Sequence, residues 1–166
     1  MRASNDDQTA SKITPFLWFD HQAEEAAEFY VSIFPNSAIG KIARYTDAGP
    51  GPKGSAMTVA FQLDGQQFTA LNGGPIFKFT EAISFVVHCE TQQEVDELWE
   101  RLSQGGQPGQ CGWLKDKFGL SWQIVPIALM EMVQDKNPAR VERVMKAMMQ
   151  MKKLDIAGLE KAYRQE

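Results

Sequence analysis

The sequence is poor in the residues that bind metals or cross-link a chain. Among its 166 residues are two cysteines and two histidines. Cys89 and Cys111 lie far apart and form no Cys-x-x-Cys pair, so neither a disulfide framework nor a zinc ribbon is expected. Unpaired cysteines are typical of a reducing compartment. We therefore expect a cytoplasmic protein whose fold needs neither a metal nor a disulfide.

Long apolar runs and an excess of basic charge are also lacking. The sequence has no run of about 18 apolar residues, and residues 1–12 are polar, so we expect a flexible N-terminus, no membrane partner and no export. The 17 basic and 21 acidic side chains give a net charge of -4, which does not favour binding to a nucleic acid. The hydrophobic content of 43% is that of an ordinary globular domain.

The hydrophobic pattern changes its period several times between residues 13 and 72. An apolar run at 13–19 predicts a strand, and apolar residues at helical spacing predict a helix over 22–34. Weak alternation predicts a strand at 38–45. Two further strands, 57–63 and 67–71, flank Asp64-Gly65, a pair that favours a tight hairpin turn. This order is β-α-β-β-β.

The same order begins again between residues 82 and 126. A strand is expected at 82–88, and Thr91 with Glu94 forms a capping box that opens a helix ending at Gly105-Gly106. A hairpin follows over 110–125. The repeat predicts an α+β fold in which two tandem βαβββ units, 13–72 and 82–126, form a curved mixed sheet around a cavity.

Residues 127–166 differ from the repeat, since they hold six of the eight methionines. Helices are expected at 127–134, at 138–151 after the cap Asn137, and at 156–164 after the cap Asp155. We interpret this tail as a helical extension of the same domain. A homodimer is expected, because the tail is rich in methionine and sheet edges invite pairing. Whether the helices pack on their own chain or on the partner stays open.

Several segments resemble the PhnB-like family of the vicinal oxygen chelate superfamily, which includes glyoxalase I, bleomycin-resistance proteins and extradiol dioxygenases. They are Ile13-Thr-Pro-Phe-Leu-Trp-Phe-Asp20, Ala23-Glu-Glu-Ala26, Phe29-Tyr30, Ile33-Phe-Pro-Asn36, Leu71-Asn-Gly-Gly-Pro75, Cys111-Gly-Trp113, Asp116-Lys-Phe-Gly119, Ser121-Trp-Gln-Ile-Val-Pro126 and Met148 through Ala157. Members are often labelled 3-demethylubiquinone-9 3-methyltransferase. That label implies a glycine-rich turn between a strand and a helix for the adenosyl cofactor, and the sequence has none.

The resemblance also implies four metal-ligand positions, on the first and last strand of each unit. In this sequence they fall on Pro15, on Ala70 or Asn72, on Ala82 and on Gln123. Proline and alanine side chains cannot bind a metal, and an amide is a weak neutral donor. We therefore expect no metal and no cofactor.

Strand alternation selects candidate residues for the cavity. The candidates are neutral and largely apolar, as in sites for small organic molecules. Alternation gives Phe19, Phe68, Asn72, Ser84, His88 and Gln123, together with Leu17, Ala70, Ser121 and Val125. Trp113 is a candidate for an aromatic rim with Phe77 and Phe79, and Cys111 is a candidate because the resemblance implies that part of the cavity wall lies there. Packing in the core is the competing interpretation for the aromatic residues and for Cys111, and a solvated turn is the competing interpretation for His21.

Three hypotheses about function follow. The first is a metal-independent vicinal-oxygen-chelate-type protein that binds a small, partly apolar organic molecule. The second is an enzyme of the superfamily, a lyase, isomerase or transferase, including the labelled methyltransferase or a metal lyase that uses His21, His88 and Glu81. The third is an interaction module with a vestigial pocket.

Overall fold

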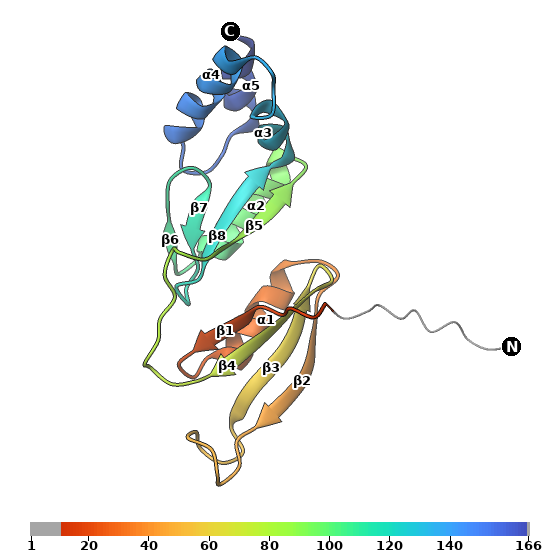
Figure 1. Cartoon of the computed structure of the whole chain (residues 1–166), viewed down its shortest axis with the longest axis vertical. Helices are drawn as coiled ribbons and strands as arrows, with labels where there is room; N and C mark the ends of the chain where they lie inside the picture. Colours follow the sequence, from red (N-terminus) through yellow and green to blue (C-terminus); the bar gives the residue numbers. More distant parts are fainter. Residues whose placement is uncertain (1–10, 166) are drawn as a thin grey trace, which may run out of the picture. The chain divides into compact units, whose positions relative to one another are not determined.

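The structure is a computed structural model that describes residues 11–165. The chain forms two compact units, the first ending at Phe77 and the second beginning at Lys78 (Figure 1). The expected α+β fold with two βαβββ units and C-terminal helices is confirmed, and each unit forms a four-stranded mixed sheet of its own. Of the segment 1–12, which was expected to be flexible, residues 1–10 lie outside the described residues.

Unit 1 has the predicted β-α-β-β-β order. Its elements are β1 (Phe16–Phe19), α1 (Ala23–Ile33), β2 (Ala38–Arg44), β3 (Ala56–Leu63) and β4 (Gln66–Asn72). The sheet order is β1-β4-β3-β2, with β1 parallel to β4 and the other pairs antiparallel. The hairpin turn forms at the predicted pair, because Asp64 (φ 46°) and Gly65 (φ 78°) both adopt the left-handed conformation that such a turn requires.

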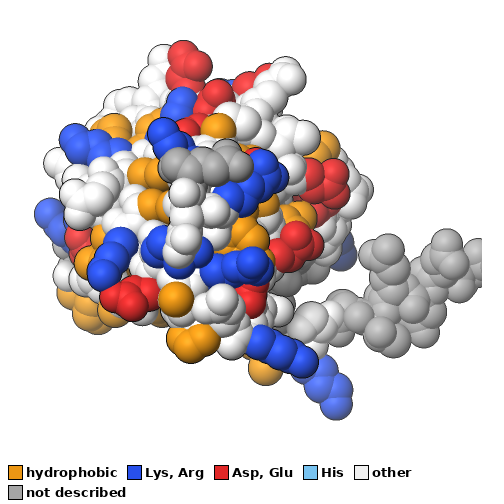
Figure 2. All heavy atoms as spheres, turned by 90° about the horizontal axis from the view of Figure 1, so that it is seen from above, with side chains coloured by type: hydrophobic (Ala, Val, Ile, Leu, Met, Phe, Trp, Pro, Cys, Tyr) orange, Lys and Arg blue, Asp and Glu red, His pale blue; other side chains and the backbone are white. Residues whose placement is uncertain are grey.

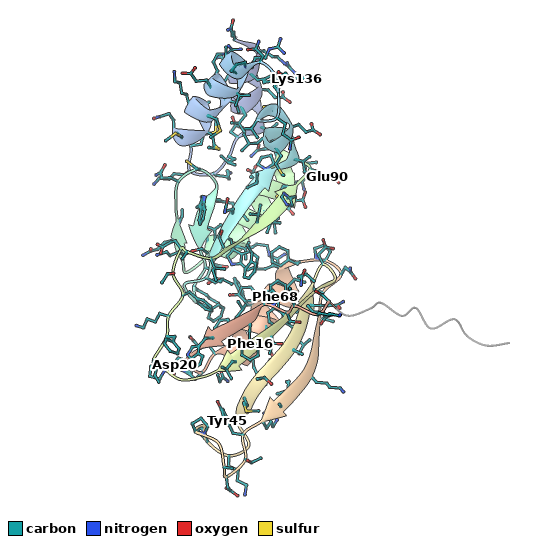
Figure 3. The ribbon with its side chains drawn as sticks, viewed as in Figure 1. Phe16, Asp20, Tyr45, Phe68, Glu90 and Lys136 are labelled. Carbon is teal, nitrogen blue, oxygen red and sulfur yellow. The ribbon has the colours of Figure 1, made fainter. Side chains whose placement is uncertain are left out.

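An aromatic stack holds α1 against its sheet. Tyr30 of α1 stacks on Phe61 of β3, with ring centroids 6.2 Å apart, and Phe61 stacks on Phe68 of β4 at 5.3 Å. Residues paired across neighbouring strands share a face of the sheet, and Phe61 pairs with Phe68. Phe68 therefore lies on the face that α1 covers, whereas Phe16 lies on the opposite face and is 59% exposed (Figure 3).

Unit 2 repeats this arrangement and adds the helical tail. Its elements are β5 (Ser84–Cys89), α2 (Gln92–Ser103), β6 (Gln107–Pro108), β7 (Trp113–Lys115), β8 (Ser121–Pro126), α3 (Ile127–Met132), α4 (Pro138–Met149) and α5 (Ile156–Arg164). The sheet order is β5-β8-β7-β6, with β5 parallel to β8. The short edge strand β6 was not predicted, because two residues that include a proline carry no alternation.

Half of the predicted capping box forms at the start of α2, because the Glu94 carboxylate bonds to the amide before the cap residue Thr91 and not to the Thr91 amide. The Thr91 hydroxyl accepts a hydrogen bond from the Glu94 amide at 3.2 Å, and the Glu94 carboxylate accepts one from the Glu90 amide at 2.8 Å. The hairpin expected over 110–125 begins only at Trp113, because Cys111 (φ 57°) and Gly112 (φ 82°) form a left-handed turn before β7. This turn separates β6 from β7.

The tail packs on its own chain. Its core consists of Leu129, Val144, Leu154 and Leu159, which are all buried. The side chain of Gln92 in α2 clamps the segment before α5, since it donates to the Leu154 carbonyl at 3.1 Å and accepts from the Ile156 amide at 2.8 Å. Both predicted caps are present: Asn137 accepts from the Ala139 amide, and Asp155 accepts from the Gly158 amide.

Three tail methionines remain open to solvent: Met130 is 37% exposed, Met145 38% and Met149 63%. The other three, Met132, Met148 and Met151, pack half-buried against the tail core. On the face seen from above, basic, acidic and hydrophobic side chains are interspersed (Figure 2). Within residues 11–165, no helix combines the length and the apolar character needed to cross a membrane.

Candidate functional site

The candidate site lies on the uncovered face of the unit 2 sheet. Leu114, Trp122 and Ile124 are buried on the face that α2 covers. The residues of the opposite face follow from the pairing of Ser84 with Ser121 and of Trp113 with Gln123. They are Ser84, Val86, His88, Trp113, Lys115, Ser121, Gln123 and Val125.

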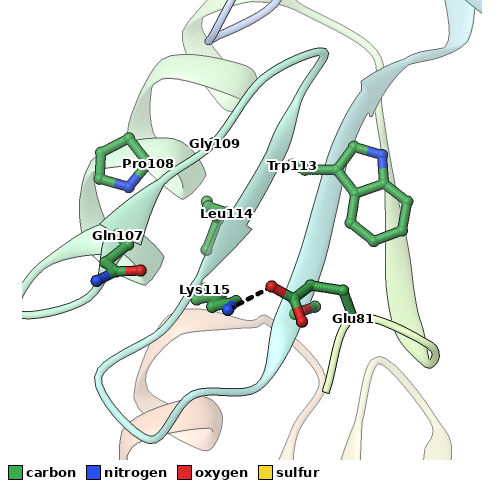
Figure 4. Close-up of a pocket in the computed structure, with 8 residues that line it drawn as sticks. Glu81, Gln107, Pro108, Gly109, Trp113, Leu114 and Lys115 are labelled. Atoms are coloured by element: carbon green, nitrogen blue, oxygen red, sulfur yellow. Dashed lines mark ion pairs between the residues drawn. The ribbon is translucent and has the colours of Figure 1, made fainter. Parts of the chain in front are cut away.

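A pocket of about 220 Å³ opens at the β6–β7 end of this sheet. Its lining includes Glu81, Gln107, Pro108, Trp113, Lys115 and Ser121. Figure 4 shows Lys115 and Glu81 meeting at one end of the pocket, with Gln107 and Pro108 on one side and the Trp113 indole on the other. The pocket thus combines an aromatic and an apolar wall with a few polar groups, as small-molecule sites do.

The charged end of the pocket is an ion pair between the Lys115 ammonium and the Glu81 carboxylate. The pKa of Glu81 is lowered, mainly by the hydrogen bond from Lys115. A backbone hydrogen bond and the Coulomb attraction of Lys115 lower it further. The Glu81 carboxylate therefore carries its charge at neutral pH, beside the Lys115 ammonium. A ligand that enters here meets a donor and an acceptor side by side.

The Ser121 hydroxyl is the unusual group of the pocket. Ser121 is 1% exposed, and its oxygen has no hydrogen-bond partner among the described residues. A buried polar group without a partner costs about 1–3 kcal/mol, so native structures rarely keep one. Ser121 is one of the residues that line the pocket.

Two further residues of the same face are fixed by each other. The Gln123 amide donates to the Ser84 hydroxyl at 2.8 Å, and this bond crosses from β8 to β5. Gln123 also pairs with Trp113 on β7. The bond holds the Gln123 side chain on the open face beside the indole.

The predicted site residues of unit 2 separate into three groups. Trp113 lines the pocket, and Ser84 and Gln123 lie on the same face beside it. His88 lies on this face, where it is exposed and pairs with Val125 in the β-sheet register. Cys111 is half-buried in the turn before β7, where its amide donates to the Met151 carbonyl at 2.8 Å.

In unit 1 the predicted alternation is correct, but the face assigned to the cavity is wrong. Phe19 and Phe68 are buried, as are Leu17 and Ala70 on the same alternation, and their face packs beneath α1. Asn72 shares this face and has a structural role, since it accepts from the Ala23 amide at 2.8 Å and donates to the Ala56 carbonyl at 3.0 Å. These residues are not part of the pocket in unit 2.

Some pocket residues could be found from the sequence and others could not. Lys115 follows from the alternation that starts at Trp113, and Ser121 from the alternation that includes Gln123. Glu81 lies in the segment before β5 and Gln107 in a two-residue strand, so neither has a pattern that predicts its position. Their place in the pocket depends on the tertiary structure.

The donor set does not fit the divalent metal that the family resemblance implies. On the uncovered face of unit 1, β1 presents Phe16 and Trp18, and β4 presents Thr69 and Leu71. In unit 2, Gln123 is bonded to Ser84. Among residues 11–165, no group of three or more histidine, cysteine, aspartate or glutamate side chains could hold a metal ion.

An adenosyl cofactor finds no glycine-rich turn either. The connections from β1 to α1 and from β5 to α2 contain no glycine, and β8 runs directly into α3. The glycines at 73 and 74 follow β4, and Gly105 and Gly106 follow α2. The described strand-to-helix turns therefore lack the close backbone approach that a nucleotide-type cofactor requires.

Comparisons with known proteins agree with this architecture. The family described as 3-demethylubiquinone-9 3-methyltransferase matches residues 11–125. A putative 3-demethylubiquinone-9 3-methyltransferase, PhnB protein, from Bacillus cereus is 41% identical, with a TM-score of 0.63 over 70% of this chain and 99% of that one. The matched family region ends before α3, so the helical tail lies outside it.

Two more distant structures share the fold alone. A protein from Pseudomonas aeruginosa is 19% identical, with a TM-score of 0.59 over 70% of this chain and 98% of that chain. The fosfomycin resistance protein FosX from Listeria monocytogenes is 15% identical, with a TM-score of 0.54 over 77% of this chain and 100% of that chain. No relative was found among curated proteins.

Proposed function

The chain belongs to the 3-demethylubiquinone-9 3-methyltransferase family, the PhnB-like branch of the vicinal oxygen chelate superfamily, and on that premise we propose that it binds a small, partly apolar organic molecule without a metal. The binding site of this proposal is the unit 2 pocket. The proposal retains Trp113, Ser84, Ser121 and Gln123 from the sequence prediction and adds Lys115 and Glu81.

The unpartnered hydroxyl of Ser121 is the observation that supports the proposal most. A buried donor without a partner lowers the stability of the fold. In a vestigial pocket, replacement of the Ser121 hydroxyl by a methyl group would remove this cost without loss of function. A ligand that accepts a hydrogen bond from Ser121 compensates this cost only when it is bound. The removal of this cost then contributes to the free energy of ligand binding.

The remaining groups define the kind of ligand. The Trp113 indole and Pro108 favour an aromatic or aliphatic body, and the Lys115–Glu81 pair favours a polar group that both accepts and donates hydrogen bonds. A pocket of about 220 Å³ limits the ligand to a small molecule. Large polymers are excluded from this site by size.

Ligand-dependent thermal stabilisation tests this proposal. The probes are a panel of hydrophobic metabolites and antibiotics, measured with the full chain and with the variants Ser121→Ala and Ser32→Ala. Ser32 lies on the exposed side of α1 in unit 1, so its replacement controls for the loss of a hydroxyl. We expect at least one compound to raise the melting temperature and Ser121→Ala to reduce this effect. A panel without any stabilisation, or equal stabilisation of Ser121→Ala, contradicts the proposal.

The activity in the family description is not included in this proposal. Methyl transfer from an adenosyl donor needs a site for that donor, and the described strand-to-helix turns contain no glycine. Calorimetric titration with S-adenosylmethionine should therefore show no binding. Saturable heat of binding would favour the transferase alternative.

The proposal includes a homodimer in a reducing, cytoplasmic location. Both cysteines are free, in keeping with a reducing compartment. Apolar side chains on the uncovered sheet faces, with Phe16 59% and Val86 44% exposed, support pairing with a second copy. Light scattering at micromolar concentration should give twice the mass of the chain, and a monomer would contradict this part of the proposal.

A further inference from the structure

Unit 1 contains a second pocket, of about 300 Å³, at the end of its sheet. The lining comes from three places: Asp20 and His21 after β1, the loop from Tyr45 to Ser55 with its Gly-Pro-Gly-Pro sequence, and Asn72 to Gly74 after β4. Figure 3 labels Asp20 and Tyr45 at this end of the unit. None of these residues belongs to the pocket in unit 2.

The walls of this pocket are built by hydrogen bonds within the unit. The Tyr45 hydroxyl donates to the Asn72 carbonyl at 2.5 Å, and the Trp18 indole donates to the Gly74 carbonyl at 2.9 Å. The Gly74 amide in turn donates to the Asp20 carbonyl at 3.1 Å. These bonds fix the three segments to one another, so the pocket is formed before any ligand binds.

Glycines are required where these walls meet. A Cβ atom on Gly51 would lie 2.3 Å from the Tyr45 ring, and one on Gly73 would lie 2.3 Å from the Trp18 indole. Real Cβ atoms do not approach other heavy atoms this closely. The loop and the β4 exit therefore lie directly against the two aromatic side chains, and Pro50 and Pro52 stiffen the loop.

The charge around the pocket is unevenly compensated. Lys53 pairs with Asp47 at 2.8 Å, and Arg44 pairs with Glu24 at 3.7 Å. Among the described residues, the only ion-pair partner of Asp20 is the His21 imidazole, at 3.5 Å. An imidazole carries a charge only when it is protonated. Within residues 11–165, the Asp20 carboxylate on the pocket wall thus has no lysine or arginine as an ion-pair partner.

We propose that the unit 1 pocket binds a small organic cation, an ammonium or guanidinium group on an apolar body. The Asp20 carboxylate accepts charge-assisted hydrogen bonds from the cation, and the His21 imidazole accepts a further N–H. Pro50 and Pro52 contact the apolar body. This site is independent of the ligand proposed for unit 2, since the two pockets share no residue.

Three matched probes test the charge requirement: benzylammonium, benzyl alcohol and benzoate, which differ in one functional group. Binding to the full chain is followed by the amide NMR signals of Gly51, Gly73 and Gly74, which line the pocket. We expect benzylammonium to shift these signals in a saturable way and benzoate to leave them unchanged. Benzyl alcohol should bind more weakly than benzylammonium, because it lacks the charge.

The variant Asp20→Asn tests the carboxylate, and Asp64→Asn is its control. Asp64 also carries one carboxylate in unit 1, but it lies in the β3–β4 turn at a left-handed φ that asparagine tolerates. We expect Asp20→Asn to weaken benzylammonium binding about tenfold and Asp64→Asn to change it less than twofold. Equal binding of benzoate, unchanged affinity in Asp20→Asn or no shift with any probe would overturn the proposal.

Discussion

Ser84 and Ser121 pair across the parallel strands β5 and β8, yet only Ser84 has a hydrogen-bond partner for its hydroxyl. The Gln123 amide donates to Ser84 at 2.8 Å, while the Ser121 oxygen is buried without a partner among the described residues. Two serines on one face of one sheet thus have opposite energetic roles. The Ser84 hydroxyl contributes a bond between two strands, whereas the buried Ser121 hydroxyl costs stability.

This difference predicts opposite effects of two matched substitutions. Ser84→Ala leaves the Gln123 amide without its acceptor and should lower the free energy of unfolding by about 1 kcal/mol. Ser121→Ala removes an unsatisfied hydroxyl and should leave stability unchanged or raise it by up to about 1 kcal/mol. Urea unfolding of both variants measures the difference. A Ser121→Ala variant less stable than Ser84→Ala would show that Ser121 has a partner in solution.

The Glu81–Lys115 pair predicts a pH effect of known sign. Lys115 lowers the pKa of Glu81, so the attraction is complete above the ordinary pKa of a glutamate and is lost as the pH falls through the lowered value. Lys115→Met should move the pKa of Glu81 up toward its ordinary value. Carboxyl-carbon NMR titration of both proteins measures the shift, which added salt should diminish because Glu81 is exposed. An unchanged pKa would mean that the pair does not form in solution.

The two cysteines should differ in reactivity. Burial raises the pKa of the Cys89 thiol to about 12, so at mildly alkaline pH almost no reactive thiolate forms there. Cys111 is half-buried in a surface turn. Native protein should therefore react with a thiol reagent at one cysteine, and unfolded protein at both. Cys111→Ala should abolish the native reaction, and a persistent reaction would place the reactive thiol at Cys89.

Docking of the tail should depend on one glutamine and not on its neighbour. Gln92 bonds to the Leu154 carbonyl and the Ile156 amide, whereas Gln93 bonds within its own helix to Glu97. Gln92→Ala should destabilise the docked tail by about 2 kcal/mol and speed amide hydrogen exchange over residues 151–165. Gln93→Ala should change neither. Similar exchange in both variants would show that the remaining contacts of the tail, among them the bond from the Cys111 amide to the Met151 carbonyl, suffice for docking.

Local signals in the sequence were sufficient for most of the elements, although not for the short strand β6. Asp64-Gly65 forms its turn, Thr91 and Glu94 cap α2, and Asn137 and Asp155 cap α4 and α5, since each of these contacts lies within a few residues. The turn from Asp116 to Gly119, which is part of the family resemblance, is also held by contacts between residues close in the sequence. The buried Asp116 carboxylate accepts bonds from the amides of Phe118 and Leu120 and also from the Trp122 indole.

By itself the sequence determined that each strand has two alternating sets of side chains, but only the tertiary structure decided which set each helix covers. In unit 1 both sets are apolar: Leu17 and Phe19 pack beneath α1, while Phe16 and Trp18 lie on the other face, so hydrophobicity could not distinguish them. In unit 2 the open set is more polar, and alternation identified it. The place of Glu81 beside Lys115 and the missing partner of the Ser121 hydroxyl depend on contacts between distant segments. The sequence could not show them, because a period of two residues describes one strand and not its neighbours.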